Sequence, residues 1–139
     1  MNTRAAMNLF LEFPAHPNNI SKVELFVRNI AQEVQLSSDL YADILVTLTE
    51  AVNNAILHGN KSNIAKYVRV SARHNAAMLT LVVTDEGEGF DSQAIADPTS
   101  PENVVKTGGR GVFLIQNICH KVAYLNNGTT VEMRFNLAQ

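Results

Sequence analysis

Polar side chains recur every three or four residues along one stretch of the chain, at Asp43, Thr47, Glu50, Asn54 and His58. Because this spacing places residues on one side of a helix, Glu50 and Asn54 would lie one turn apart on the same face. There a carboxylate could accept a proton, and an amide oxygen could join the shell of a hydrated magnesium ion. The simpler alternative is a solvated polar face. His58, next to a glycine, is more typical of a helix end than of catalysis.

A second cluster is acidic and rich in glycine, Asp85-Glu86-Gly87-Glu88-Gly89, and it directly follows an apolar run. An aspartate at a strand end could accept hydrogen bonds from an amino group, and the glycines would let the backbone approach a ligand. An acidic turn explains the same residues equally well. A calcium loop is disfavoured, because the twelfth position counted from Asp85 is an alanine and not a bidentate glutamate.

A third cluster, Gly108-Gly109-Arg110-Gly111, stands at the start of an apolar helical pattern. Backbone N–H groups and the positive end of a helix dipole suit such a place to phosphate, although a flexible hinge is an equal alternative. The cluster matches neither a P-loop nor the dinucleotide-binding fingerprint. Five of the seven glycines lie in the second and third clusters, which flank a long loop over 91–110. This arrangement suggests a nucleotide with a lid over it.

The elements that must position these clusters follow from hydrophobic periodicity and turn signals. Helices are predicted over about 21–35 and 38–59, and another helix is predicted to begin near Gly111. The predicted strands are 9–13, 67–71, 78–84, 121–125 and 130–135, the last two joined by a turn around Asn127-Gly128. The sequence therefore predicts one domain over 1–139, an α/β (α+β) two-layer sandwich. Its helices would cover one face of a mixed, mostly antiparallel sheet.

Composition limits the class of protein. With 139 residues, 46% of them hydrophobic and 17% charged, the chain suits one globular domain and not a disordered chain. A formal net charge of −2 gives no electrostatic case for nucleic acid or an anionic membrane, and no apolar run is long enough to span a bilayer. The single cysteine, Cys119, excludes an internal disulfide and is most simply a buried thiol. A reducing cytoplasm is the expected location.

Four segments taken in order carry a family resemblance; they read EAVNNAILHG (50–59), DEGEGF (85–90), GRGVFLI (109–115) and GTTV (128–131). They resemble the boxes of the GHKL (gyrase, chaperone, histidine kinase, MutL) domain, whose ATP-binding fold is also called the Bergerat fold. Within it, they are most similar to the anti-sigma-factor serine kinases of the RsbW and SpoIIAB type, as is the segment 98–103 in the expected lid. The resemblance covers about 9–135, and four boxes in this order are far more specific than one.

The resemblance implies a role for each matching residue. Glu50 matches the general base that activates a serine hydroxyl on a protein substrate, and Asn54 matches the magnesium-binding asparagine. Asp85 matches the carboxylate that reads the adenine amino group. The other implied nucleotide contacts give the base room, approach the phosphates from the lid or lie beside the adenine. They are Gly87, Gly89, Gly109, Arg110, Gly111 and either Thr129 or Thr130.

The function that the resemblance implies is a regulatory protein kinase using ATP and Mg²⁺. It would sequester a sigma factor and phosphorylate a STAS-type anti-sigma-factor antagonist on serine or threonine. A homodimer is expected, with no direct contact to nucleic acid or membrane. The alternative is an ATP-gated sequestering module without phosphate transfer, because Glu50 could be retained in a domain that serves only as a clasp.

Overall fold

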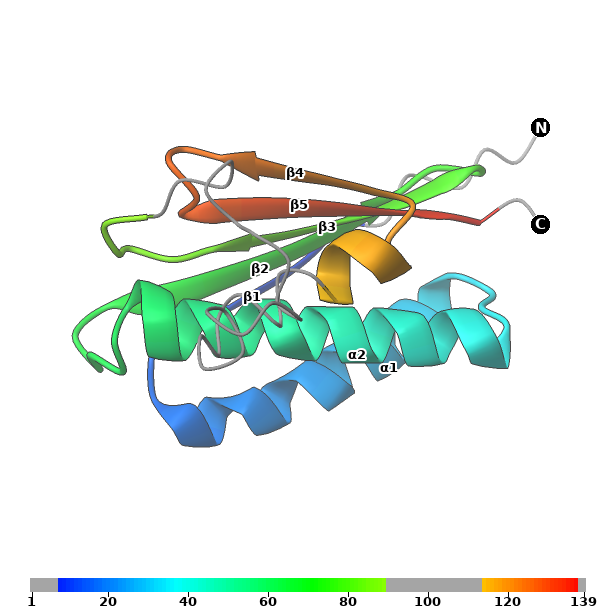
Figure 1. Cartoon of the computed structure of the whole chain (residues 1–139). Helices are drawn as coiled ribbons and strands as arrows, with labels where there is room; N and C mark the ends of the chain where they lie inside the picture. The colour runs from blue at the N-terminus through cyan, green and yellow to red at the C-terminus, as the bar shows by residue number, and fades with distance from the viewer. Residues whose placement is uncertain (1–7, 90–113, 138–139) are drawn as a thin grey trace.

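The computed structural model describes residues 8–89 and 114–137 (Figure 1). This part contains a five-stranded sheet in the order β1-β2-β3-β5-β4. The strands are β1 (Asn8–Pro14), β2 (Tyr67–His74), β3 (Met78–Thr84), β4 (Lys121–Leu125) and β5 (Thr130–Asn136). Helices α1 (Lys22–Glu33) and α2 (Ser38–Asn54) pack against each other across one face of the sheet. The predicted two-layer sandwich is therefore confirmed.

The sheet differs from the prediction in one respect, because every strand pair within the described residues is antiparallel and none is parallel. The pairs β2–β3 and β4–β5 are hairpins, so their strands must run in opposite directions. The pairs β1–β2 and β3–β5 join strands separated by long connections, and their direction follows from how those connections fold back. Strand patterns in the sequence do not specify that direction.

Helix α1 follows a short 3₁₀ turn, η1 (Pro17–Ser21), which begins at a proline. The buried side chains of α1 are Val23, Phe26, Val27 and Ile30. Their spacing is that of one helix face turned toward a core, as the sequence predicted. The helix ends at Glu33, two residues before the predicted end, because Val34 adopts an extended backbone with φ −127° and ψ 129°.

Helix α2 begins where the sequence predicted, since the Ser37 side chain accepts a hydrogen bond from the Leu40 N–H at 3.1 Å. The predicted end at Gly59 is also confirmed. The last residues, however, form a π-helical turn, η2 (Ala55–Gly59), which the sequence pattern did not predict. Such turns occur mostly as single bulges and often at functional sites.

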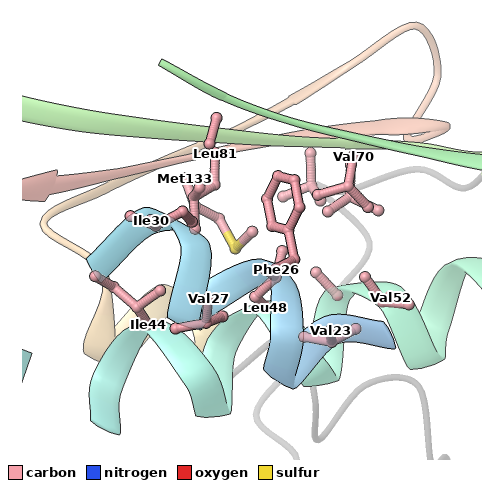
Figure 2. Packing of buried hydrophobic residues seen from close by; sticks show 14 of the residues in the cluster. Val23, Phe26, Val27, Ile30, Ile44, Leu48, Val52, Val70, Leu81 and Met133 are labelled. Atoms are coloured by element: carbon pink, nitrogen blue, oxygen red, sulfur yellow. The ribbon is translucent and has the colours of Figure 1, made fainter. Parts of the chain in front are cut away.

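The hydrophobic core lies between the helices and the sheet (Figure 2). Side chains of α1 and α2 meet side chains of β2, β3 and β5, which include Val70, Leu81 and Met133. Cys119 is buried as predicted, and burial raises the pKa of its thiol to about 12. Among the residues that the structure describes, no helix is long and apolar enough to cross a membrane. This core fixes α2 relative to β3, the elements that carry the first two polar clusters.

Candidate functional site

Glu50 and Asn54 lie on the last two turns of α2, and both are partly buried. The intervening Ala51 and Val52 are buried in the core, so the rotation of α2 about its axis is fixed at this point. Asp43 and His58 are exposed, as a solvated polar face would require. The polar face is nevertheless not uniformly solvated. Thr47, at 0% exposure, lies within it and donates to the Asp43 carbonyl oxygen at 2.7 Å.

The π-turn brings Gly59 against the acidic cluster that follows β3. The N–H of Asn60 donates to the Ala55 carbonyl oxygen at 2.8 Å, which closes the wide turn. A Cβ atom on Gly59 would overlap the Asp85 carboxylate, with Oδ1 only 2.8 Å away. Gly87 is equally constrained, because a Cβ there would overlap the Gly59 carbonyl group. The two clusters therefore meet at two glycines where an added Cβ would overlap a neighbouring group.

Asp85 itself is held by hydrogen bonds at its backbone and at its side chain. Its N–H donates to the Thr129 carbonyl oxygen at 2.9 Å, and its Oδ1 accepts the Gly87 N–H at 2.8 Å. Burial raises the pKa of the Asp85 carboxyl, while the Gly87 N–H and the positive charge of Lys66 act in the opposite direction. Asp85 is thus a partly desolvated hydrogen-bond acceptor at the end of a strand.

Asn60 is a residue of this region that sequence reasoning missed. It is 1% exposed, its Nδ2 donates to the Tyr67 carbonyl oxygen at 3.0 Å, and its Oδ1 accepts the Glu86 N–H at 2.8 Å. A signal was present, because an asparagine outside a helix or strand readily hydrogen-bonds to backbone groups through its side chain. Nothing in the sequence, however, indicates which backbone groups it would reach.

The structure separates the two threonines that the sequence left equivalent. The Thr130 hydroxyl lies 3.3 Å from that of Thr84, its partner across β3 and β5. The buried neighbours Val83 and Val131 face the helices, so alternation directs Thr84 and Thr130 to the opposite face of the sheet. Thr129 lies opposite Asp85 in the continued register, and it therefore shares the face on which Asp85 meets Gly59.

The turn between β4 and β5 is shifted by one residue from the prediction. Asn126 and Asn127 are its central residues, with φ of 53° and 57°, and the Gly128 N–H donates to the Leu125 carbonyl oxygen at 3.0 Å. Asparagine tolerates this left-handed conformation, so the two central positions do not need a glycine. Gly128 comes directly after them and also has a positive φ, 83°. A Cβ on Gly89 would overlap the Asn127 carbonyl oxygen, so this hairpin also contacts the acidic cluster.

Three of the four segments that carry the family resemblance are thus brought together: the end of α2, the residues after β3 and the β4–β5 turn. The fourth, with Gly109, Arg110, Gly111 and the expected lid over 91–110, lies outside the described residues. Within the described ranges, no group of three or more His, Cys, Asp or Glu side chains could hold a metal. A partly buried acceptor such as Asp85 suits an adenine amino group.

Comparison with known proteins places this site in a family. A family model described as "Histidine kinase-like ATPase domain" matches residues 13–135. The serine-protein kinase RsbW of Bacillus licheniformis is 30% identical over 94% of this chain and 86% of its own length. The anti-sigma F factor of Bacillus thuringiensis is 30% identical over 94% of this chain and 91% of its own length.

A solved structure supports the fold. The crystal structure of the RsbU and RsbW domains of a Mycobacterium tuberculosis protein matches with a TM-score of 0.61 at 15% identity. The match covers 94% of this chain and 32% of that chain. The likeness concerns the fold alone, while the family model spans nearly all the described elements. The chain belongs to the histidine kinase-like ATPase domain family.

Proposed function

We propose that this protein is an ATP-dependent protein serine/threonine kinase of the anti-sigma type. Membership of an ATPase family supports the nucleotide, and relatives named serine-protein kinase RsbW and anti-sigma F factor support the activity. The observation that carries the nucleotide site is the partly buried Asp85 carboxylate, seated against Gly59 and held by the Gly87 N–H. Its acceptor atoms lie where the end of α2 meets the end of β3.

In this proposal Asp85 accepts a hydrogen bond from the exocyclic amino group of adenine. Thr129 is the threonine beside the base, because it shares the face of Asp85 whereas Thr130 faces the other way. The Thr129 hydroxyl donates to the Asn126 carbonyl oxygen at 2.8 Å, which leaves its lone pairs available as acceptors. Gly87 and Gly89 let the backbone approach the base closely.

ATP with Mg²⁺ supplies the phosphoryl group when bound, and the chain contributes position and charge. Glu50 would accept the proton of the substrate serine hydroxyl as the hydroxyl oxygen bonds to the γ-phosphorus of ATP, and the bond between that phosphorus and the leaving ADP oxygen breaks. Asn54, one helical turn farther on, would hold the metal through its amide oxygen. Gly109, Arg110 and Gly111 are proposed to contact the phosphates. The shared face of Glu50 and Asn54 supports this division of roles, because the base and the metal must act at neighbouring points.

The proposed partners are a sigma factor, which the protein sequesters, and a STAS-type antagonist, which it phosphorylates. The printed name of the Bacillus thuringiensis relative supports a sigma factor as partner. A homodimer is part of the same proposal. The kinase would then control how much sigma factor is free, because phosphorylation decides whether the antagonist can compete for it.

The test is transfer of γ-labelled phosphate from ATP to proteins of the native host, with bound nucleotide quantified in the same samples. Wild type and Glu50→Ala are compared. We expect a small labelled acceptor with wild type, loss of label with Glu50→Ala and similar bound ATP in both. Bound ATP without label, with the unphosphorylated antagonist shown to be present, would favour the nucleotide-gated sequestering module. Absence of bound ATP in wild type would contradict the assignment of Asp85.

A further inference from the structure

Asn60 joins three segments through both ends of its side-chain amide. Nδ2 donates to the Tyr67 carbonyl oxygen and Oδ1 accepts the Glu86 N–H, at 3.0 and 2.8 Å. The Tyr67 N–H in turn donates to the Glu86 carboxylate. The three residues therefore close a ring of hydrogen bonds between the end of α2, the start of β2 and the loop after β3. Asn60 is the buried member of this ring, since Tyr67 and Glu86 are both exposed.

This ring lies directly beside Asp85. Glu86 follows Asp85 in the chain, so its hydrogen bond to Asn60 fixes the peptide unit that joins the two acidic residues. The N–H of Asp85 is fixed on the other side by the Thr129 carbonyl oxygen at 2.9 Å. Gly59, against which the carboxylate lies, immediately precedes Asn60. Asn60 therefore fixes both the backbone that carries Asp85 and the surface against which its carboxylate packs.

We propose that Asn60 is a positioning residue that sets the base preference of the site by holding the Asp85 carboxylate in place. The inference rests on the proposed nucleotide-binding function. A carboxylate fixed as an acceptor favours adenine, which presents an amino donor, over hypoxanthine, which presents a carbonyl acceptor at the same ring position. A carboxylate on a loosened loop could turn away from the carbonyl group, so it discriminates less between the two bases.

The experiment compares the full-length wild type with Asn60→Ala, using calorimetric Kd values for ATP and for inosine triphosphate and a thermal melt. We expect Asn60→Ala to weaken ATP binding about tenfold and inosine triphosphate binding less than about threefold, since a buried hydrogen-bond pair is lost. The preference for ATP should therefore shrink. Catalytic turnover at saturating ATP should change less than the ATP affinity does.

Asn75→Ala is the matched control. The Asn75 Oδ1 also accepts two backbone hydrogen bonds, from Ala77 and Met78 at 2.8 and 2.9 Å, but in the turn at the opposite end of β2 and β3. We expect this variant to lower the melting temperature and to keep the wild-type preference for ATP. A change of preference in Asn75→Ala equal to that in Asn60→Ala would show that the effect is only structural, and would overturn the inference.

Further outcomes separate the inference from the function on which it rests. A folded Asn60→Ala variant with the wild-type preference overturns the role of Asn60 and leaves the kinase proposal standing. If Asn60→Ala does not fold, Asn60→Ser, which keeps one hydroxyl, replaces it and must also show a reduced preference. A wild-type protein that binds neither nucleotide would contradict the proposed function, and the inference would be overturned with it.

Discussion

Helices α1 and α2 pack against the same face of the sheet, yet their polar residues have different surroundings. Every charged residue of α1 is exposed, and Glu24 and Arg28 pair with each other at 2.8 Å in solvent. Such exposed pairs contribute little to stability. In α2, by contrast, Thr47 is fully buried while Glu50 and Asn54 are partly buried. One helix thus keeps its polar groups in water, and the other holds several of them at or below the protein surface.

The ends of the two helices differ in the same way. Helix α1 ends regularly, with the Val34 N–H donating to the Ile30 carbonyl oxygen at 2.8 Å. Helix α2 widens into a π-turn and continues into Gly59 and Asn60, which contact the loop after β3. Helix α1 therefore contributes mainly packing, whereas α2 is also proposed to position groups for a ligand. Changes that affect ligand binding or transfer should therefore be concentrated in α2 and its contacts.

The largest expected difference is between one glutamate of each helix. Glu50→Ala should lower the rate of phosphate transfer by about 10²–10⁴ and leave ATP affinity nearly unchanged, because a general base acts on the chemical step. Glu33→Ala, at the exposed end of α1, should keep the wild-type rate. The measurement is the initial rate of transfer at saturating ATP. Equal rates for the two variants would contradict the role of Glu50.

Asp85→Asn should weaken ATP binding by about 1.5–3 kcal/mol, the usual size of a hydrogen bond to a charged group. The replacement removes the negative charge of the side chain that lies against Gly59 and keeps nearly the same side-chain shape. Titration calorimetry with ATP gives the free energy directly. Asp39→Asn, in the exposed first turn of α2, is the matched control and should bind ATP as wild type does. A fully retained affinity in Asp85→Asn would remove adenine recognition from this residue.

Gly59→Ala should lower the free energy of unfolding by about 1–3 kcal/mol, because the added Cβ overlaps the Asp85 carboxylate and overpacks the contact. In an ordinary helix the same replacement would stabilise. Gln32→Ala, exposed in the last turn of α1, should change stability by less than about 0.5 kcal/mol. Urea denaturation of both variants makes the comparison. A stabilised Gly59→Ala protein would show that the close contact is absent.

The N-terminal caps of the helices should differ by a smaller amount. Ser37 accepts the Leu40 N–H, so Ser37→Ala should cost about 1 kcal/mol of stability. Ser21 makes no side-chain cap hydrogen bond, so Ser21→Ala should lower stability by only a few tenths of a kcal/mol, roughly. Denaturation midpoints at constant m-value test both changes. Equal losses would mean that the Ser37 cap does not stabilise α2.

The smallest expected effect is a pH dependence from Asp85. Burial raises its pKa above the ordinary value of 3.8, so the unfolded chain releases the proton at lower pH than the folded protein does. The resulting contribution to stability is therefore fully present below pH 3.8 and is lost as the pH rises through the raised folded-state pKa. As the pH rises through this window, the unfolding free energy of wild type should fall relative to that of Asp85→Asn. A difference that is constant with pH would contradict the raised pKa.

Much of the fold could be predicted because it depends on local patterns. The strands over 78–84 and 121–125 lie where they were predicted, since alternating or continuous apolar runs bounded by turn residues specify them. Helix α2 begins at the predicted serine cap. The β4–β5 turn was placed one residue too late, because Asn-Gly is the stronger turn signal while Asn126-Asn127 is the pair that adopts positive φ. Local sequence signals therefore indicate that a turn is present more reliably than they indicate which two residues are at its centre.

The candidate site was predicted as residue types and not as an arrangement. Glu50 and Asn54 share a helix face because four residues make about one turn, a property of the chain alone. The meeting of Gly59 with Asp85, and of Gly89 with Asn127, joins segments that are far apart in sequence. Such contacts depend on how the layers pack, which no local pattern encodes. The predicted roles of these residues in catalysis and nucleotide binding remain predictions.

By itself, the amino-acid sequence determined the elements, the buried stripe of each helix and the residue types that could handle a nucleotide, since all of these depend on the period of the backbone. Only the tertiary structure decided that the sheet is antiparallel throughout its described strands, that Thr129 and not Thr130 shares a face with Asp85, and that Asn60 ties α2 to the acidic cluster. The physical reason is that strand direction, register and buried hydrogen-bond partners are set by packing between distant segments, whose geometry exists only once the core has formed.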